Sequence, residues 1–302
     1  METTTAPLTS VDPKQYDYAV EGPRQSQLWD QRYILFLQDV TAVFDGFKAL
    51  DIADLGIGHH ELRVVVGPNG AGKTTMCDVI SGMTKPTTGQ VYFDGQPITG
   101  LDETQIAQQG VGRKFQIPNV FDSLSVWENM LLALPNGSQG IGSKDHRRTL
   151  DPRITGPGGI ALLRFLENCK TIGGKANPEA RDRIHDILTR VRLIDDLHTP
   201  AKSLSHGQRQ WLAISSLILA RPKLLLVDEP AAGLTDAETA LTAELLLELK
   251  DEHTIICIEH DMEFVRQLDS RVTVLNEGQV LAEGTLDQVQ SNEAVIEAYL
   301  GR

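Results

Sequence analysis

Hydrophobic residues in this chain gather in short runs that are apolar at successive positions. The segments 61–67 (ELRVVVG), 224–227 (LLLV) and 254–259 (TIICIE) are of this kind. Strands of a parallel sheet are covered on both faces and therefore show continuous apolar runs, whereas half-exposed strands alternate. Helical patterns lie between the runs, for example over residues 237–250. The pattern predicts an α/β fold with a mostly parallel sheet.

Two stretches depart from this pattern. Residues 1–32 are polar and interrupted by prolines, so we expect a flexible extension or a peripheral strap, with ordered structure beginning at Tyr33. Residues 135–160 are rich in glycine and proline. They predict a long loop within a helical insertion, which is either a surface excursion without a role or a feature whose role the sequence does not show.

Charge and cysteine usage narrow the function classes. Lys and Arg number 28 against 41 Asp and Glu, a formal net charge of −13, so we do not expect nucleic acid as a partner. Cys77, Cys169 and Cys257 are odd in number and lack CxxC spacing, which favours a reducing cytosol over a disulfide framework or a zinc site. No apolar run approaches the roughly 20 residues that cross a bilayer, and the opening lacks a signal peptide's apolar segment. Any membrane role is therefore expected to act through a partner.

A glycine-rich turn follows the first buried strand. It matches G-x-x-x-x-G-K-[ST] and precedes the helix-like sequence TTMCDVISGM, which is the context that a phosphate-binding P-loop requires. Backbone N–H groups and the positive end of the helix would surround nucleotide phosphates. Lys73 would add a cation near the β- and γ-phosphates, and Thr74 would place its hydroxyl on Mg²⁺. The predicted ATP-binding residues are Gly67, Pro68, Asn69, Gly70, Ala71, Gly72, Lys73, Thr74 and Thr75.

Two carboxylates end the strand at 224–227. Asp228 and Glu229 lie where ligands of open α/β sheets gather. We predict that Asp228 joins the Mg²⁺ shell and that Glu229 orients or deprotonates the attacking water. Polar residues commonly end buried strands, so only the P-loop makes this pair strong evidence. His260 follows the next strand; it is either structural or solvated, or it contacts the γ-phosphate, as we predict.

A second turn of small residues opens the helix predicted over 209–220. It consists of Leu204, Ser205, His206, Gly207 and Gln208. Alone, it would indicate an N-capped helix, although a serine hydroxyl, a glycine N–H and a helix dipole also suit an anion. The order P-loop, LSHGQ, Asp-Glu, His resembles that of the ABC ATPases.

The resemblance covers roughly residues 33–302 and implies a fold and an assembly. The fold would be a P-loop α/β core with a mostly parallel sheet, an antiparallel β subdomain, and a helical subdomain inserted at about residues 116–211. Two ATPase subunits would close head to tail with ATP between them. The signature residues Ser205, His206, Gly207 and Gln208 would then serve the partner's nucleotide.

Two further positions acquire roles from the resemblance. Gln116, in GVGRKFQIPNVF, matches the Q-loop glutamine that senses the γ-phosphate and Mg²⁺ and touches the membrane partner. Phe44, in AVFDGF, matches the aromatic residue that stacks on adenine, although it could equally belong to the core. The predicted catalytic residues are thus Glu229, His260 and Gln116, and the predicted Mg²⁺ ligands are Thr74, Gln116 and Asp228.

The closest likeness is to importers of branched-chain amino acids and urea. RKFQIPNVFDSLSVWENM, DEPAAGLTDAET, IEHDMEFV and EAVIEAYLGR resemble that branch, and LSHGQRQW, GLTDAET and VLAEG resemble its urea-type ATPases. The resemblance implies a peripheral ATPase subunit on the cytoplasmic face of the inner membrane. Its partners would be a related but different ATPase chain, two integral permeases and, indirectly, a periplasmic solute-binding protein.

We expect urea as the solute, with branched-chain amino acids as the alternative. An ABC exporter subunit, or a non-transport ABC protein acting on DNA or ribosomes, is less favoured, and the signature argues against a simple P-loop kinase.

Two positions depart from the family pattern. His206 replaces the glycine commonly third in the signature, which hints at the urea-type branch, and Thr235 stands where many ABC ATPases have the D-loop aspartate, with Asp236 one place later. The second leaves the inter-subunit contacts of that loop open.

Overall fold

The computed structural model describes residues 32–114, 120–134 and 178–300. These residues form two compact units, one from the segments Met1–Gln116 and Pro222–Arg302 and the other from Ile117–Arg221. The predicted extension, except for its last residue, and the glycine-rich stretch 135–160 lie outside the described residues. Among the described helices, none has the length and apolar character needed to cross a membrane.

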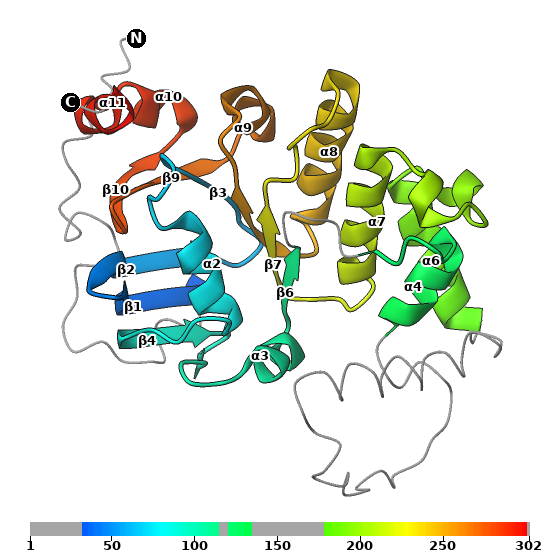
Figure 1. Ribbon diagram of the computed structural model, residues 1–302, viewed down its shortest axis with the longest axis horizontal. Coiled ribbons are helices and arrows are strands. Elements are labelled where there is room, and N and C mark those ends of the chain that lie inside the picture. The colour runs from blue at the N-terminus through cyan, green and yellow to red at the C-terminus, as the bar shows by residue number, and fades with distance from the viewer. Residues whose placement is uncertain (1–31, 115–119, 135–177, 301–302) are drawn as a thin grey trace, which may run out of the picture. The chain divides into compact units, whose positions relative to one another are not determined.

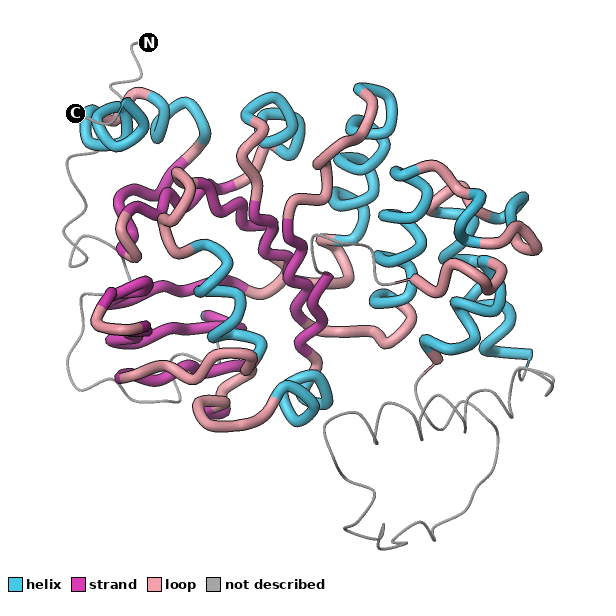
Figure 2. The backbone as a smooth tube through the Cα atoms, viewed as in Figure 1, coloured by secondary structure: helices cyan, strands magenta, loops and turns pink. Residues whose placement is uncertain are grey.

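The first unit contains a six-stranded sheet in the order β10-β9-β3-β8-β7-β6, seen edge-on in Figures 1 and 2. Neighbouring strands are parallel except for the antiparallel edge pair β9 and β10. Every residue of the three central strands is buried, as their apolar runs predicted. The strands are β3 (Leu62–Val66), β6 (Val111–Lys114), β7 (Leu224–Asp228), β8 (Thr254–Ile258), β9 (Arg271–Asn276) and β10 (Gln279–Gly284).

Helices connect these strands, so the predicted α/β fold with a mostly parallel sheet is confirmed. Alternating strands and helices place each crossover over one face of the sheet. The helices of this unit are α2 (Lys73–Ser81), α3 (Glu103–Gln109), α8 (Asp236–Leu249), α9 (Met262–Leu268), α10 (Leu286–Gln290) and α11 (Glu293–Leu300).

The same unit carries the antiparallel sheet that the family resemblance implied. Its order is β2-β1-β4-β5, from β1 (Tyr33–Phe44), β2 (Phe47–Gly58), β4 (Thr88–Phe93) and β5 (Gln96–Pro97). Leu37 and Ile52 of this sheet belong to one hydrophobic cluster with Val65 and Ile258 of the parallel sheet. A shared core therefore fixes β1 and β2 against the parallel sheet, whose strand β3 runs into the P-loop.

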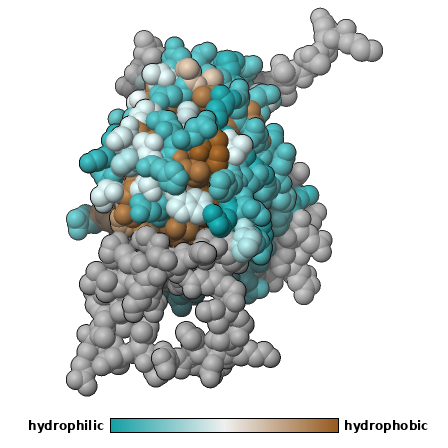
Figure 3. All heavy atoms as spheres, turned by 90° about the vertical axis from the view of Figure 1, so that its right-hand side faces the viewer, coloured by the Kyte–Doolittle hydropathy of each residue, from teal (hydrophilic) through white to brown (hydrophobic). Residues whose placement is uncertain are grey.

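The second unit is helical. Its described elements are α4 (Val126–Ala133), α6 (Pro178–Arg190), α7 (His206–Ile218) and the short 3₁₀ turns η3 (Ile194–Asp196) and η4 (Ala201–Ser203). Both α4 and α6 pack on α7. Met130, Ile184 and Leu212 are among the buried residues of these helices. Figure 3 shows one face of the molecule, which is mostly hydrophilic with a hydrophobic patch near its middle.

Candidate functional site

Three central strands end together at one edge of the parallel sheet. Ile258, the last residue of β8, is the register partner of both Val65 and Asp228. The N–H of Glu229 donates to the Ile258 carbonyl at 3.0 Å, and the N–H of Glu259 donates to the Val65 carbonyl at 3.2 Å. The glycine-rich turn, the Asp-Glu pair and the histidine loop are therefore neighbours at the carboxyl ends of the strands, where such sheets bind ligands.

The turn after β3 has a backbone that only glycine can form at two positions. A Cβ on Gly67 would come within 2.2 Å of the Leu275 carbonyl oxygen, and one on Gly72 within 2.6 Å of the Ala49 carbonyl oxygen. Gly72 also has a φ of 99°, in the left-handed region. The close approach to Ala49 places β2 beside the turn.

The start of α2 and the side chain of Lys73 form a cradle suited to an anion. Gly72 precedes the helix without a side-chain cap, so the first-turn N–H groups are open to a ligand. The Lys73 ammonium donates to the carbonyl oxygens of Gly67 at 2.6 Å and Pro68 at 3.1 Å. Burial lowers the pKa of Lys73, while Glu229 and Asp228 act in the opposite direction. Thr74 is exposed on the first turn. The residues present fit a polyphosphate with its Mg²⁺.

Asp228 is buried beside two basic side chains. Its exposed fraction is 4%, and burial raises the pKa of its carboxyl group, while Arg113 lowers it. Arg113 lies 4.0 Å from Asp228 and 2.6 Å from Asp78. The Lys114 ammonium donates to the Asp228 carbonyl oxygen at 3.3 Å, and burial lowers the pKa of Lys114 to about 8. Sequence reasoning missed both basic residues, although they stand in the GVGRKFQ stretch.

The side chains of Glu229 and His260 lie close together. The Glu229 Oε1 and His260 Nδ1 atoms are 3.6 Å apart, and their side chains are 26% and 63% exposed. Glu229 has a φ of 46°, a conformation that non-glycine residues adopt rarely and that gathers at functional sites. A carboxylate and an imidazole that are this close and open to solvent can together hydrogen-bond to a water molecule and orient it.

Phe44 is exposed rather than part of the core. It ends β1 and pairs across the hairpin with Phe47, the first residue of β2. Their exposed fractions are 47% and 65%, so two phenyl rings stand in solvent at the hairpin end. Sequence reasoning missed Phe47, whose signal was the hairpin pattern F-D-G-F. Exposed rings are suited to stacking on a nucleobase.

The signature residues lie in the helical unit, at the start of α7. Ser205 is the N-cap: its hydroxyl accepts from the Gln208 N–H at 3.1 Å, and the Gln208 side chain accepts from the Ser205 N–H at 2.9 Å. Ser205 and His206 are exposed, Gly207 is buried, and His206 Nε2 lies 3.3 Å from Gln210 Nε2. The N-capped helix is thus confirmed. Gln116, the predicted Q-loop residue, lies outside the described residues.

Thr235, the departure in the D-loop, caps α8. Its hydroxyl accepts from the Glu238 N–H at 3.4 Å, and the Glu238 carboxylate accepts from the Thr235 N–H at 3.0 Å. Threonine and aspartate are both good N-caps. The helix start is therefore preserved despite the departure.

Tyr299 on α11 contacts the P-loop, which sequence reasoning also missed. Tyr299 is 44% exposed; partial burial raises the pKa of its phenol, and a backbone hydrogen bond from the Gly67 N–H lowers it. The ending EAVIEAYLGR was informative only as a family likeness, because nothing in its local pattern indicates a contact with a turn more than 200 residues earlier.

Comparisons with known proteins agree with this geometry. Residues 50–232 match the family model described as ABC transporter, and residues 279–302 match one described as branched-chain amino acid ATP-binding cassette transporter. The high-affinity branched-chain amino acid transport ATP-binding protein LivG of Escherichia coli is 35% identical over 89% of this chain and 98% of its own length. BraF of Pseudomonas aeruginosa, with the same description, is 34% identical over 89% and 98%.

Solved structures show the same fold. A nucleotide-free ATP-binding cassette from an ABC transporter matches with a TM-score of 0.72 and 27% identity, over 89% of this chain and 99% of that one. A cassette solved as a dimer bound to ADP and inorganic phosphate matches with a TM-score of 0.62 and 25% identity, over 83% and 98%. The chain therefore belongs to the ABC transporter family, as an ATPase subunit of its branched-chain amino acid transporter group.

Proposed function

We propose that this chain hydrolyses ATP to drive uptake of branched-chain amino acids through an ABC importer. The observation that carries the proposal is the C-terminal match, because residues 279–302 fit a model described as branched-chain amino acid ATP-binding cassette transporter. Two full-length relatives carry the same description. Our expectation of urea rested on three short motifs, and the comparisons favour the alternative instead.

The P-loop residues bind the triphosphate in this proposal. Glycine turns and the uncapped start of α2 present N–H groups, and the Lys73 ammonium moves from its carbonyl partners to the phosphates. Phe44 and Phe47 hold the adenine at the hairpin end. Mg²⁺, held by Thr74, Asp228 and Gln116, supplies charge neutralisation for the phosphates.

Glu229 and His260 carry the hydrolytic step in this proposal. Glu229 orients or deprotonates the attacking water, and His260, 3.6 Å away, contacts the γ-phosphate. Replacing Glu229 with Gln keeps the shape but removes the base. Glu229→Gln is therefore expected to retain ATP binding and to lower turnover about 10²- to 10⁴-fold. Unchanged turnover would remove Glu229 from the mechanism.

The assembly in this proposal pairs the chain head to tail with a related ATPase chain on two membrane permeases, at the cytoplasmic face. One structural neighbour is itself a dimeric cassette. Ser205, His206, Gly207 and Gln208 then face the partner's nucleotide.

The solute is tested in the reconstituted importer. The chain is co-purified with its permeases, placed in liposomes, and given the cognate binding protein loaded with leucine, isoleucine, valine or urea. We expect ATP hydrolysis to be stimulated by the amino-acid-loaded protein and not by the urea-loaded one. Stimulation by urea alone would reverse the assignment, because specificity resides in the binding protein and the permeases rather than in the ATPase.

A further inference from the structure

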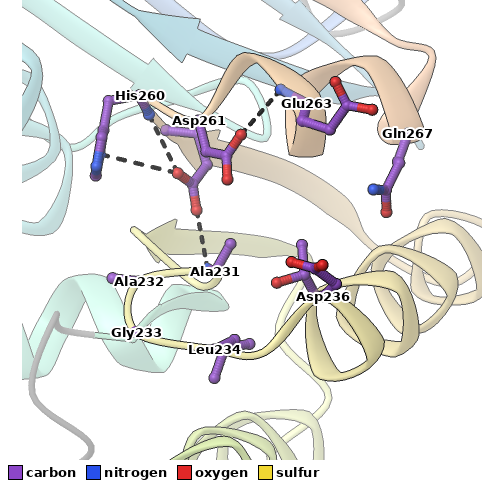
Figure 4. A pocket seen from close by; sticks show the side chains of 11 residues that line it. Ala231, Ala232, Gly233, Leu234, Asp236, His260, Asp261, Glu263 and Gln267 are labelled. Carbon is purple, nitrogen blue, oxygen red and sulfur yellow. Dashed lines mark hydrogen bonds and ion pairs between the residues drawn. The ribbon is translucent and has the colours of Figure 1, made fainter.

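Glu259 is a buried carboxylate between two loops of the candidate site. It directly follows β8, and its exposed fraction is 1%. One carboxylate oxygen accepts from the Ala231 N–H at 2.9 Å, and the other accepts from the His260 N–H at 3.1 Å. A backbone bond from Asp261 adds to these. Figure 4 shows Ala231 on one loop and His260 and Asp261 on the other, with dashed lines converging on the carboxylate between them.

Burying an ionised carboxylate at this position costs free energy unless hydrogen-bond donors surround it. Burial raises the pKa of Glu259, and the N–H donors lower it. An ionised carboxylate only accepts hydrogen bonds, so it can take N–H groups from both sides at once. An amide would turn its own NH₂ toward one of those donors.

The loop that Glu259 holds contains the strained residue of the site. Glu229 has a φ of 46°, and its N–H donates to the Ile258 carbonyl at 3.0 Å. Two residues later, the Ala231 N–H donates to Glu259. Left-handed conformations of non-glycine residues persist only where the surroundings over-determine them. The bond to Ala231 is therefore the second anchor of this turn.

The other loop carries the histidine. The His260 Nδ1 atom lies 3.6 Å from Glu229 and 4.0 Å from Glu259. Since the His260 N–H is also bound to Glu259, a single carboxylate ties the backbones on which both side chains stand.

We propose that Glu259 is a positioning residue for ATP hydrolysis, which holds the Glu229 turn and the His260 loop at the separation that hydrolysis requires. The inference rests on the proposed roles of Glu229 and His260. It adds a residue that touches neither nucleotide nor water and acts through its two neighbours.

The test separates turnover from nucleotide binding in the assembled transporter. Glu259→Gln is expected to lower kcat about 10- to 100-fold, because small misplacements of catalytic groups have effects of this size, and to change KM for ATP less than about twofold. Glu259→Asp keeps a carboxylate and should retain more of kcat than Glu259→Gln. A wild-type kcat in Glu259→Gln, or the reverse order of the two variants, contradicts the proposal.

A double variant distinguishes positioning from general destabilisation. If Glu259 acts through Glu229 and His260, the Glu229→Gln, Glu259→Gln double variant should lose less activity than the sum of the two single losses. Fully additive losses would overturn the proposal. Glu283→Gln is the matched control, since Glu283 is also buried and lies beside Arg63; it should lower the Tm while leaving kcat of the folded protein unchanged. Full activity in Glu229→Gln would instead contradict the proposed catalytic role of Glu229, independently of the activity of Glu259→Gln.

Discussion

The hydrogen bond between Gly67 and Tyr299 joins the C-terminal helix to the P-loop. The Gly67 N–H donates to the phenol of Tyr299, and the Gly67 carbonyl accepts from the Lys73 ammonium. Gly67 is thereby held through both its N–H and its carbonyl group, which belong to successive peptide groups. A P-loop that is ordered before ATP arrives loses less conformational entropy on binding, which favours affinity.

Tyr299→Phe removes only the phenol oxygen. We expect the Kd for ATP to rise about 2- to 10-fold, the effect of one hydrogen bond, with little change in the Tm of the nucleotide-free chain. Titration with a fluorescent ATP analogue measures the Kd. Tyr92→Phe, on β4, is the matched control and should bind like the wild type. An equal Kd in Tyr299→Phe would show that the contact does not order the loop.

Two cysteines are predicted to be unreactive while the chain is folded. Cys77 and Cys257 are fully buried, and burial raises the pKa of Cys77 to about 12 and that of Cys257 well above its usual value. Because the thiolate is the nucleophile, only about one Cys77 in 10⁴ is reactive at pH 8. Iodoacetamide followed by site-resolved mass spectrometry should find both unmodified in buffer and modified in urea. Modification of either in buffer at the rate seen in urea would contradict the burial.

The sequence could predict the roles of residues that lie together in one motif, but not contacts between residues that are distant in the chain. The residues from Gly67 to Thr75 are contiguous, so a motif contains their chemistry. Glu259 and Tyr299 each contact a residue far away in the chain, Ala231 and Gly67, and no local sequence pattern indicates either contact. Glu229 was predicted as a base, but its left-handed backbone depends on the Ile258 carbonyl and could not be predicted.

Among the elements, the buried strands were the most predictable. The predicted runs 224–227 and 254–259 each lie within one residue of the observed bounds of β7 and β8, because full burial on both faces leaves a continuous apolar pattern. The helix predicted from residue 209 begins at His206 instead. Capping by Ser205 and Gln208 extends it by almost one turn, and such caps decide helix ends more than hydrophobic periodicity does.

Thr235 illustrates the same effect at α8. The capping box with Glu238 satisfies two groups at the helix start, so Thr235→Ala should lower the free energy of unfolding by about 1 kcal/mol and the Tm by about 2 °C. Thr235→Asp keeps a side-chain acceptor and should stay within a few tenths of a kcal/mol of the wild type. Differential scanning calorimetry measures both, with Glu248→Ala on the exposed side of α8 as control. A Thr235→Ala protein as stable as the wild type would show that the cap contributes nothing.

For the whole molecule, the two motifs of the chain belong to different units. The P-loop lies in the unit with the two sheets, and Ser205 begins α7 in the helical unit. In the proposed head-to-tail dimer, each chain therefore contributes half of two nucleotide sites. Binding of ATP by the isolated chain would need only the P-loop half, whereas hydrolysis would need Ser205 from across the interface.

Ser205→Arg tests this division. The exposed Ser205 side chain is far from this chain's own nucleotide in the proposed dimer, so the Kd for ATP of the isolated chain should stay within about twofold of the wild type. In the assembled transporter, the arginine would occupy the space of the partner's γ-phosphate, and ATP hydrolysis at that site should be lost. Ser291→Arg, the same change at another exposed serine, should hydrolyse ATP normally. Weakened ATP binding by the isolated Ser205→Arg chain would place Ser205 in this chain's own site. Undiminished hydrolysis in the transporter would argue against the head-to-tail dimer with ATP between its subunits.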